Sequence, residues 1–253
     1  MKKYSNRISL IKNARGVYDL DTVKGCKYGL SHNPKGCYGN CYAYNGAARY
    51  GYDFKNSVKR NFISLNHEEY IKEEIKKIDM PFIRIGVSGD PSECWEHTIN
   101  VCEKIKDLGK EIVIITKHWL PLPENLYERM SIINPIINTS VSALDGDLLE
   151  YRLGEYRKMK ILSKSILRLV SCDFNTNNIK GQKYKKIQDK LFENYNILDT
   201  VLRIPEDHYL VKNRILHIEK VEFLNFSVYA SLYNKNAYLG YCSACPEMCG
   251  LNI

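Results

Sequence analysis

The chain has 253 residues, of which 44% are hydrophobic and 26% are charged, an ordinary composition for a globular protein. Its 37 basic and 29 acidic side chains leave a net charge of +8, which favours an anionic partner only weakly because the basic residues are scattered. No apolar run is long enough for a signal peptide or a membrane span, so we expect a cytoplasmic protein without a membrane partner. In that compartment the nine cysteines are expected to serve metal binding, catalysis or core packing rather than disulfides.

Hydrophobic patterns along the chain predict strands that alternate with helices. Strands are expected at 17–23, 82–87, 111–116, 136–142, 166–171, 198–204 and 221–229. Helices are expected at 66–78 with Asn66 as the N-cap, 92–108, 124–131, 146–161 and 182–195. This succession is typical of parallel βα units. It predicts an α/β fold, a partial (β/α) TIM-like barrel of about six parallel strands over residues 1–230, with a cysteine-rich extension at 231–253.

Three cysteines gather between the first two strands, in the stretch 24–52, KGCKYGLSHNPKGCYGNCYAYNGAARYGY. Its content of glycine, asparagine and tyrosine favours an irregular loop over a helix or strand. Cys26, Cys37 and Cys41 are three thiols, whereas a structural zinc ion takes four protein ligands. A cubane iron–sulfur cluster held by three cysteines keeps one iron open for another ligand. Zinc with His32 as the fourth ligand is the alternative.

Small, hydroxylated and charged residues recur where the predicted strands end. In a parallel barrel these ends form the edge that binds ligands. Ser88, Gly89 and Asp90 follow the second strand, and Lys117 follows the third. Ser142 ends the fourth strand, ahead of the sequence Leu144-Asp145-Gly146. These residue types suit a polar cofactor that has amine, carboxylate and ribose groups.

Taken together, these motifs resemble the radical S-adenosylmethionine superfamily. The cysteine loop, an SGDP turn after the second strand and SVSALDGD at the fourth strand occur in the family's order. The core GCYGNCYA, the ITK after the third strand and the terminal cysteines also resemble phage-borne members, and the loop is distantly similar to that of spore photoproduct lyase. The likeness spans residues 17–204.

The resemblance implies a [4Fe–4S] cluster on Cys26, Cys37 and Cys41, whose open iron binds S-adenosylmethionine. Reductive cleavage of that cofactor would start radical chemistry on a substrate, with an electron donor such as flavodoxin or ferredoxin. The residues that the resemblance assigns to the cofactor are Ser88, Gly89, Asp90, Lys117, Ser142 and Tyr42, with Tyr38, Tyr42 and Tyr44 able to stack on adenine.

The cysteine spacing departs from the family pattern. The family carries C-x3-C-x2-C, whereas this loop reads C-x10-C-x3-C, and Tyr44 stands where a further cysteine would follow. Either Cys26 contributes from the other side of an enlarged loop, or the site does not bind a cluster with an open iron. We favour the first interpretation.

A second cysteine triplet ends the sequence, with Cys242, Cys245 and Cys249 in GYCSACPEMCGLNI. The spacing C-x2-C-x3-C fits an auxiliary iron–sulfur cluster and a zinc site equally well. Cys172 is the first candidate for a fourth ligand, whereas Cys102 lies on an apolar helix stripe with Trp95, Ile99 and Ile105 and is expected to be core.

The substrate is not specified by any motif. The positive charge and the 19 tyrosines lean towards a nucleic acid or nucleotide, with peptides and small metabolites as alternatives. We expect the cysteine-rich tail to close the open side of the barrel. The competing function is a zinc-stabilised nucleic-acid-binding protein without catalysis.

Overall fold

The protein is described by a computed structural model that covers residues 7–56 and 58–253. A nine-stranded sheet runs through it in the order β1-β2-β5-β6-β7-β8-β9-β11-β10. In chain order the strands are β1 (Ile11–Lys12), β2 (Tyr18–Asp19), β5 (Phe82–Ile85), β6 (Glu111–Thr116), β7 (Ile136–Val141), β8 (Ser165–Ser171), β9 (Ile197–Arg203), β10 (Glu219–Phe223) and β11 (Phe226–Ser231). A separate two-stranded sheet pairs β3 (Val23–Lys24) with β4 (Lys59–Arg60).

The six strands from β2 to β9 in sheet order are parallel to their neighbours, as the sequence predicts. The flanking strands β1, β11 and β10 are antiparallel. In the described residues β1 and β10 are the two outer strands and do not pair with each other, so the sheet is open. A mixed α/β fold with a largely parallel sheet is therefore confirmed.

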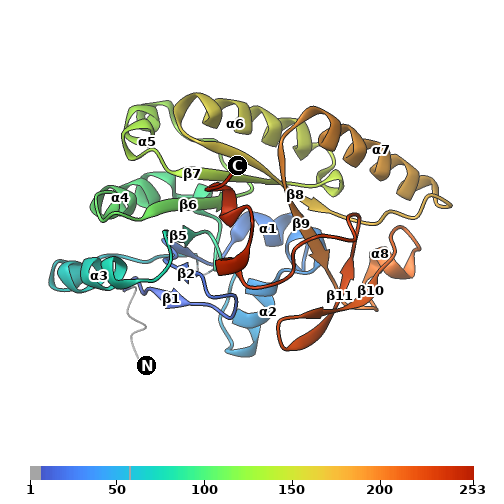
Figure 1. Ribbon diagram of the computed structural model, residues 1–253, viewed down its shortest axis with the longest axis horizontal. Coiled ribbons are helices and arrows are strands. Elements are labelled where there is room, and N and C mark those ends of the chain that lie inside the picture. The colour runs from blue at the N-terminus through green and yellow to red at the C-terminus, as the bar shows by residue number, and fades with distance from the viewer. Residues whose placement is uncertain (1–6, 57) are drawn as a thin grey trace.

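Five helices cover the outer side of the sheet, the first preceding β5 and the others following β5, β6, β7 and β8 in turn (Figure 1). They are α3 (Leu65–Lys77), α4 (Trp95–Ile105), α5 (Tyr127–Ile133), α6 (Leu148–Leu162) and α7 (Ile179–Asn194). The predicted apolar stripe of α4 is buried, with Trp95, Ile99, Cys102 and Ile105 each at most 3% exposed. Burying this stripe against the sheet is what holds the helix, since isolated helices of this length are marginal in water. The predicted N-cap of α3 is wrong, because the helix begins two residues earlier with Ser64 as N-cap.

Two segments predicted as single strands each contain two strands in the structure. The segment 17–23 divides into β2 and β3, which belong to different sheets. The chain leaves the main sheet at Asp21, whose carboxylate accepts the backbone N–H groups of Gly86, Val87 and Ser88. The segment 221–229 is a hairpin of β10 and β11, because Leu224 takes a positive φ of 57° and turns the chain back. A long apolar run conceals such a turn.

The stretch 24–52 is also more regular than predicted. It contains α1 (Lys27–His32), a 3-10 turn η1 (Cys37–Gly39) and α2 (Tyr42–Arg49). Figure 1 shows α1 and α2 on the inner side of the sheet, away from the outer helices. A further short helix, α8 (Tyr209–Lys212), was not predicted.

The C-terminal segment packs on the inner side of the sheet near the beginnings of its central strands (Figure 1). Asn138 of β7 donates to the carbonyl of Cys249 over 2.9 Å, and Gly250 lies against Ile136 and Ile166. Cys242 and Cys249 belong to the main hydrophobic cluster. The segment therefore lies towards the amino ends of β7 and β8, whereas the first cysteine loop lies at the carboxyl ends, where Gly25 pairs with Gly89.

Candidate functional site

Each cysteine of the first triplet lies at the start of a helical turn. Cys26 is the N-cap of α1, and its sulfur accepts the N–H of Gly29 over 3.4 Å. Cys37 begins η1, and Cys41 is the N-cap of α2. The loop is thus built from three short turns, each of which presents one thiol.

Two glycines allow the sulfurs to approach one another. A side-chain carbon added at Gly29 would lie 3.1 Å from the sulfur of Cys26 and 3.6 Å from that of Cys37. At Gly36, where φ is +85°, such a carbon would lie 2.2 Å from Cβ of Cys41. Any other residue at Gly36 would displace Cys41 and strain the backbone. Gly29 therefore leaves room for the sulfurs of Cys26 and Cys37, and Gly36 leaves room for Cys41.

These thiols are poorly solvated. Burial raises the pKa of Cys37 to about 11 and also raises the pKa of Cys41. Burial raises the pKa of Cys26 well above its ordinary value, and the nearby carboxylates of Asp90 and Glu93 raise it further. Thiolates at these positions would need positive charge beside them, which a bound metal supplies on displacing the protons.

Among the described residues, no three histidine, cysteine or acidic side chains are placed to hold a single metal ion. His32 lies at the edge of the site, with its ring 6.0 Å from the ring of Trp119. The thiols of the first triplet are therefore not arranged as a site for a single ion in the described residues.

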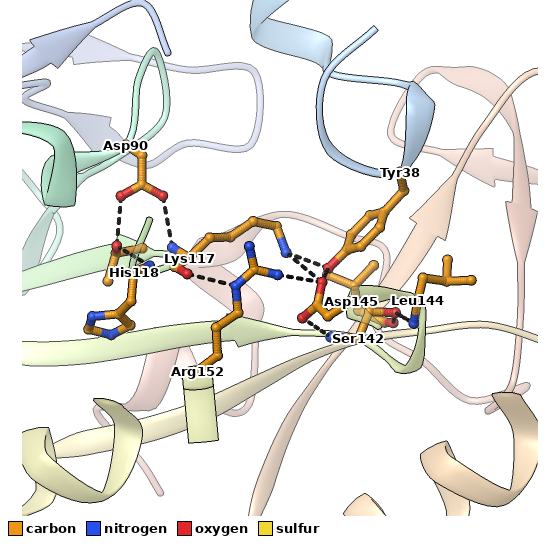
Figure 2. A network of polar contacts seen from close by, with 10 residues as sticks. Tyr38, Asp90, Lys117, His118, Ser142, Leu144, Asp145 and Arg152 are labelled. Carbon is orange, nitrogen blue, oxygen red and sulfur yellow. Dashed lines mark hydrogen bonds and ion pairs between the residues drawn. The ribbon is translucent and has the colours of Figure 1, made fainter. Parts of the chain in front are cut away.

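A buried polar network lies beside the cysteine loop (Figure 2). Arg152 of α6 places Nη1 2.5 Å from Oδ1 of Asp145, and Tyr38 donates its hydroxyl to the same oxygen over 2.9 Å. The ammonium group of Lys117 contacts the Tyr38 hydroxyl and lies 3.7 Å from Asp145. Because Tyr38 is the neighbour of Cys37, the network ties the cysteine loop to the ends of β6 and β7.

The network contains two cations and two carboxylates, and Asp90, the carboxylate farther from Arg152, accepts the backbone N–H of Lys117 over 2.8 Å (Figure 2). The two cations, Lys117 and Arg152, surround the carboxylate of Asp145, and all three side chains are at most 11% exposed. Burial lowers the pKa of Lys117, although Asp145 acts in the opposite direction. Nη2 of Arg152 is buried and has no hydrogen-bond partner among the described residues. The site can therefore accept an anionic group.

A cleft with a volume of about 100 Å³ opens onto this network. Its lining residues come from α1, η1, the ends of β6 and β7, and the helices α6 and α8: His32, Asn33, Cys37, Tyr38, Lys117, Trp119, Leu144, Asp145, Arg152 and Tyr209. Of the residues that we assigned to the cofactor, Lys117 is in this lining.

Two other predicted cofactor residues, Asp90 and Ser142, do not line the cleft but form hydrogen bonds that support it. Asp90 accepts the hydroxyl of Thr116 over 2.7 Å and the N–H of Lys117 over 2.8 Å, and it caps the turn before α4 (Figure 2). Ser142 is fully buried and caps the turn that contains Asp145, donating its own hydroxyl to the carbonyl of Val170. Both therefore position a residue of the cleft.

The SGDP turn is closely packed through its backbone. Gly89 is buried, and a side-chain carbon there would lie 2.5 Å from the carbonyl oxygen of Gly25. Ser88 accepts the N–H of Gly25 on its carbonyl. Tyr42 does not line the cleft, since its hydroxyl donates to the carbonyl of Val87 and 65% of the residue is exposed.

Sequence reasoning missed Arg152, Trp119 and Tyr209. Arg152 had a detectable signal, because it occupies a buried-face position of α6, four residues before Tyr156 and seven before Met159. An arginine on such a face needs a buried partner, which here is Asp145 together with the ring of Trp119, 4.6 Å from the guanidinium carbon.

The second cysteine triplet is largely buried. Cys242 is 4% and Cys249 is 7% exposed, and the thiol of Cys245 lies 3.3 Å from a carboxylate oxygen of Glu247. Cys172 packs in a separate cluster with Phe174 and Leu202. The structure therefore does not bring Cys172 to this triplet as a fourth ligand.

Comparison with known proteins assigns no identity to this chain. No protein-family profile matches it, and no curated protein does so either. In the part of the chain that the structure describes, no helix has the length and apolar character needed to cross a membrane.

Proposed function

We propose that this protein is a radical S-adenosylmethionine-type iron–sulfur enzyme that cleaves its cofactor reductively and starts radical chemistry on a substrate. One observation supports this best. Three free thiols of one loop begin successive helical turns next to Gly29 and Gly36, at the carboxyl edge of a parallel sheet, and the adjoining cleft is lined by Lys117 and Arg152.

The donor set fits a [4Fe–4S] cluster better than a single ion. In a cluster each of Cys26, Cys37 and Cys41 would bind a different iron, so their sulfurs need not converge on one point. When bound, the cluster supplies the electron that cleaves the sulfonium cofactor.

The residues of the cleft would bind and orient the cofactor. Lys117 and Arg152 present two cations to its carboxylate, while Asp145 keeps both in place. Trp119 and Tyr209 line the same cleft and would exclude water from the reacting groups. Asp90 and Ser142 would act through Lys117 and Asp145 rather than by direct contact.

Five further expectations belong to this proposal. The open sheet would be the partial barrel of the superfamily, and the protein would work in the cytoplasm with a flavodoxin or ferredoxin as electron donor. Its likeness to phage-borne members would extend to function. The cysteines at 242, 245 and 249 would hold a second iron–sulfur cluster or zinc.

Anaerobic purification followed by measurement of iron, sulfide and visible absorbance tests the proposal. Cys26→Ala, Cys37→Ala and Cys41→Ala are each expected to remove about four irons per chain. Cys94→Ala is the control, since Cys94 lies outside the loop, in the 3-10 turn Pro91–Cys94. Stoichiometric zinc without iron would overturn the proposal in favour of a zinc-stabilised nucleic-acid-binding protein.

The same measurement applied to the second triplet decides what the tail binds. A loss of about four irons in the variant Cys242→Ala/Cys245→Ala/Cys249→Ala would identify a second cluster. Unchanged iron with a loss of zinc would identify a zinc site.

A further inference from the structure

The segment 24–60 carries a large share of the positive charge of this protein. This segment contains one acidic residue, Asp53, and seven basic residues: Lys24, Lys27, Lys35, Arg49, Lys55, Lys59 and Arg60. It therefore contributes +6 of the net charge of +8. A second basic run, residues 180–190 on α7, has five lysines and one aspartate.

Several basic residues on the outer helices are paired with carboxylates, although Lys180, Lys183 and Lys186 of α7 form no ion pair among the residues that the structure describes. On α3, Lys72 and Lys76 pair with Glu68 and Glu73, and on α7 Lys185 pairs with Asp189. Within the described residues, the exposed side chains of Lys24, Arg49 and Lys55 form no ion pair with a carboxylate. Their charge is available to an external anion.

A groove lies within this basic face. It has a volume of about 530 Å³, and its lining is mostly aromatic, small and polar: Leu30, Ser31, Pro34, Tyr44, Ala48, Tyr52, Asp53, Phe54, Lys55 and Asn56. Lys24 and Lys59 each place their ammonium group 5.0 Å from the centre of the Tyr52 ring. Tyr50, at the end of α2, is 88% exposed. Aromatic rings flanked by cations are the usual means of binding unpaired bases and their phosphates.

We propose that this face binds a single-stranded nucleic acid, with a base in the groove and the backbone phosphates on Lys24, Arg49 and Lys55. Bases in a duplex are stacked and would not reach the groove, which favours an unpaired strand. An acidic electron-donor protein could also bind to these positive charges, but its binding would not require a groove lined by aromatic rings.

The groove lies on the other side of α1 from the cleft. Leu30 and Ser31 line the groove, whereas His32 and Asn33 line the cleft. A strand bound in the groove would therefore pass beside the cysteine loop. That the strand is also the substrate rests on the proposed function; the binding itself does not.

Fluorescence anisotropy with a labelled single-stranded oligonucleotide of mixed sequence, as DNA and as RNA, tests this inference over a range of salt concentrations. The variant Lys24→Gln/Arg49→Gln/Lys55→Gln is expected to weaken binding at least about tenfold and to reduce the salt slope by about 2, since each phosphate contact contributes about 0.7. Tyr52→Leu is expected to weaken binding about tenfold without changing the slope.

The matched control is Lys180→Gln/Lys183→Gln/Lys186→Gln, which removes the same charge from exposed positions of α7. It should weaken binding no more than about twofold. Equal losses in the two triple variants would overturn the inference, because binding would then follow net charge alone. Equally tight binding of a duplex would also overturn the inference. The same holds if the variant Lys24→Gln/Arg49→Gln/Lys55→Gln loses affinity for a flavodoxin and keeps its affinity for the oligonucleotide.

Binding is measured with and without iron, which separates this inference from the proposed function. A protein that holds zinc instead of iron but binds strands at this face would support the inference and overturn only the enzymatic proposal. An iron-loaded protein that binds no strand would overturn only the inference.

Discussion

Nη1 of Arg152 lies 2.5 Å from Oδ1 of Asp145, and neither side chain is more than 2% exposed. Burial alone would raise the pKa of Asp145, but Lys117 and Arg152 together hold it below its ordinary value. The pair joins α6 to the turn after β7 beneath the cleft (Figure 2). It is therefore both a structural link and a support of the cleft.

Replacing Arg152 with glutamine should destabilise the protein by about 3 kcal/mol, because it leaves a buried carboxylate with one cation instead of two. The free energy of unfolding in urea measures this. Arg157→Gln is the control, since Arg157 is exposed on the same helix and should change stability by less than about 0.5 kcal/mol. A loss at Arg152 no larger than at Arg157 would contradict the assigned role of the pair.

Stability should fall as the pH decreases from about 6.5 to about 4 because of His118. Burial lowers the pKa of this histidine from its ordinary value of 6.5 to about 4, so in this range the unfolded state binds a proton that the folded state does not. The contribution is complete above pH 6.5 and amounts to about 3 kcal/mol. His118→Asn, which tolerates the φ of +48° at this position, should flatten the profile, whereas the exposed His217→Asn should not. An unchanged profile in His118→Asn would show that another group titrates.

Gly36→Ala should disturb the cysteine loop. The added carbon would lie 2.2 Å from Cβ of Cys41, and the φ of +85° disfavours alanine. We expect iron binding to fall as far as in Cys41→Ala. Gly46→Ala in α2 is the matched control, because no atom lies within 4 Å of the added carbon and alanine favours a helix. Full iron content in Gly36→Ala would show that the position of Cys41 is not critical.

Tyr38→Phe should weaken binding of S-adenosylmethionine about tenfold while leaving the iron content unchanged, because the lost hydroxyl hydrogen bonds to the charged Lys117 and Asp145. Calorimetric titration of the anaerobic protein measures the affinity. Tyr44→Phe is the comparison, since Tyr44 contacts Phe54 on the groove side and lies outside the cleft. If both variants bind the cofactor equally well, the network does not support its site.

The sequence by itself determined the central elements of the fold. The predicted strand 111–116 agrees with β6, and the stripe of α4 is buried as predicted, because long periodic patterns record directly which side chains must leave water. The three thiols of the first loop were also visible in the sequence, whereas the approach of Cys26 and Cys37 in space depends on the turns that the structure builds around Gly29.

Only the tertiary structure decided which distant residues meet at the site and which of them line the cleft. Arg152, Trp119 and Tyr209 come from separate parts of the chain and meet at the cleft through the packing of α6 and α8 on the sheet. Asp90 and Ser142 look like ligands in sequence, but their oxygens are occupied by backbone and side-chain groups that strand pairing brings to them. Residue type reveals which hydrogen bonds a side chain can make, whereas the fold decides which partners lie within hydrogen-bond distance of it.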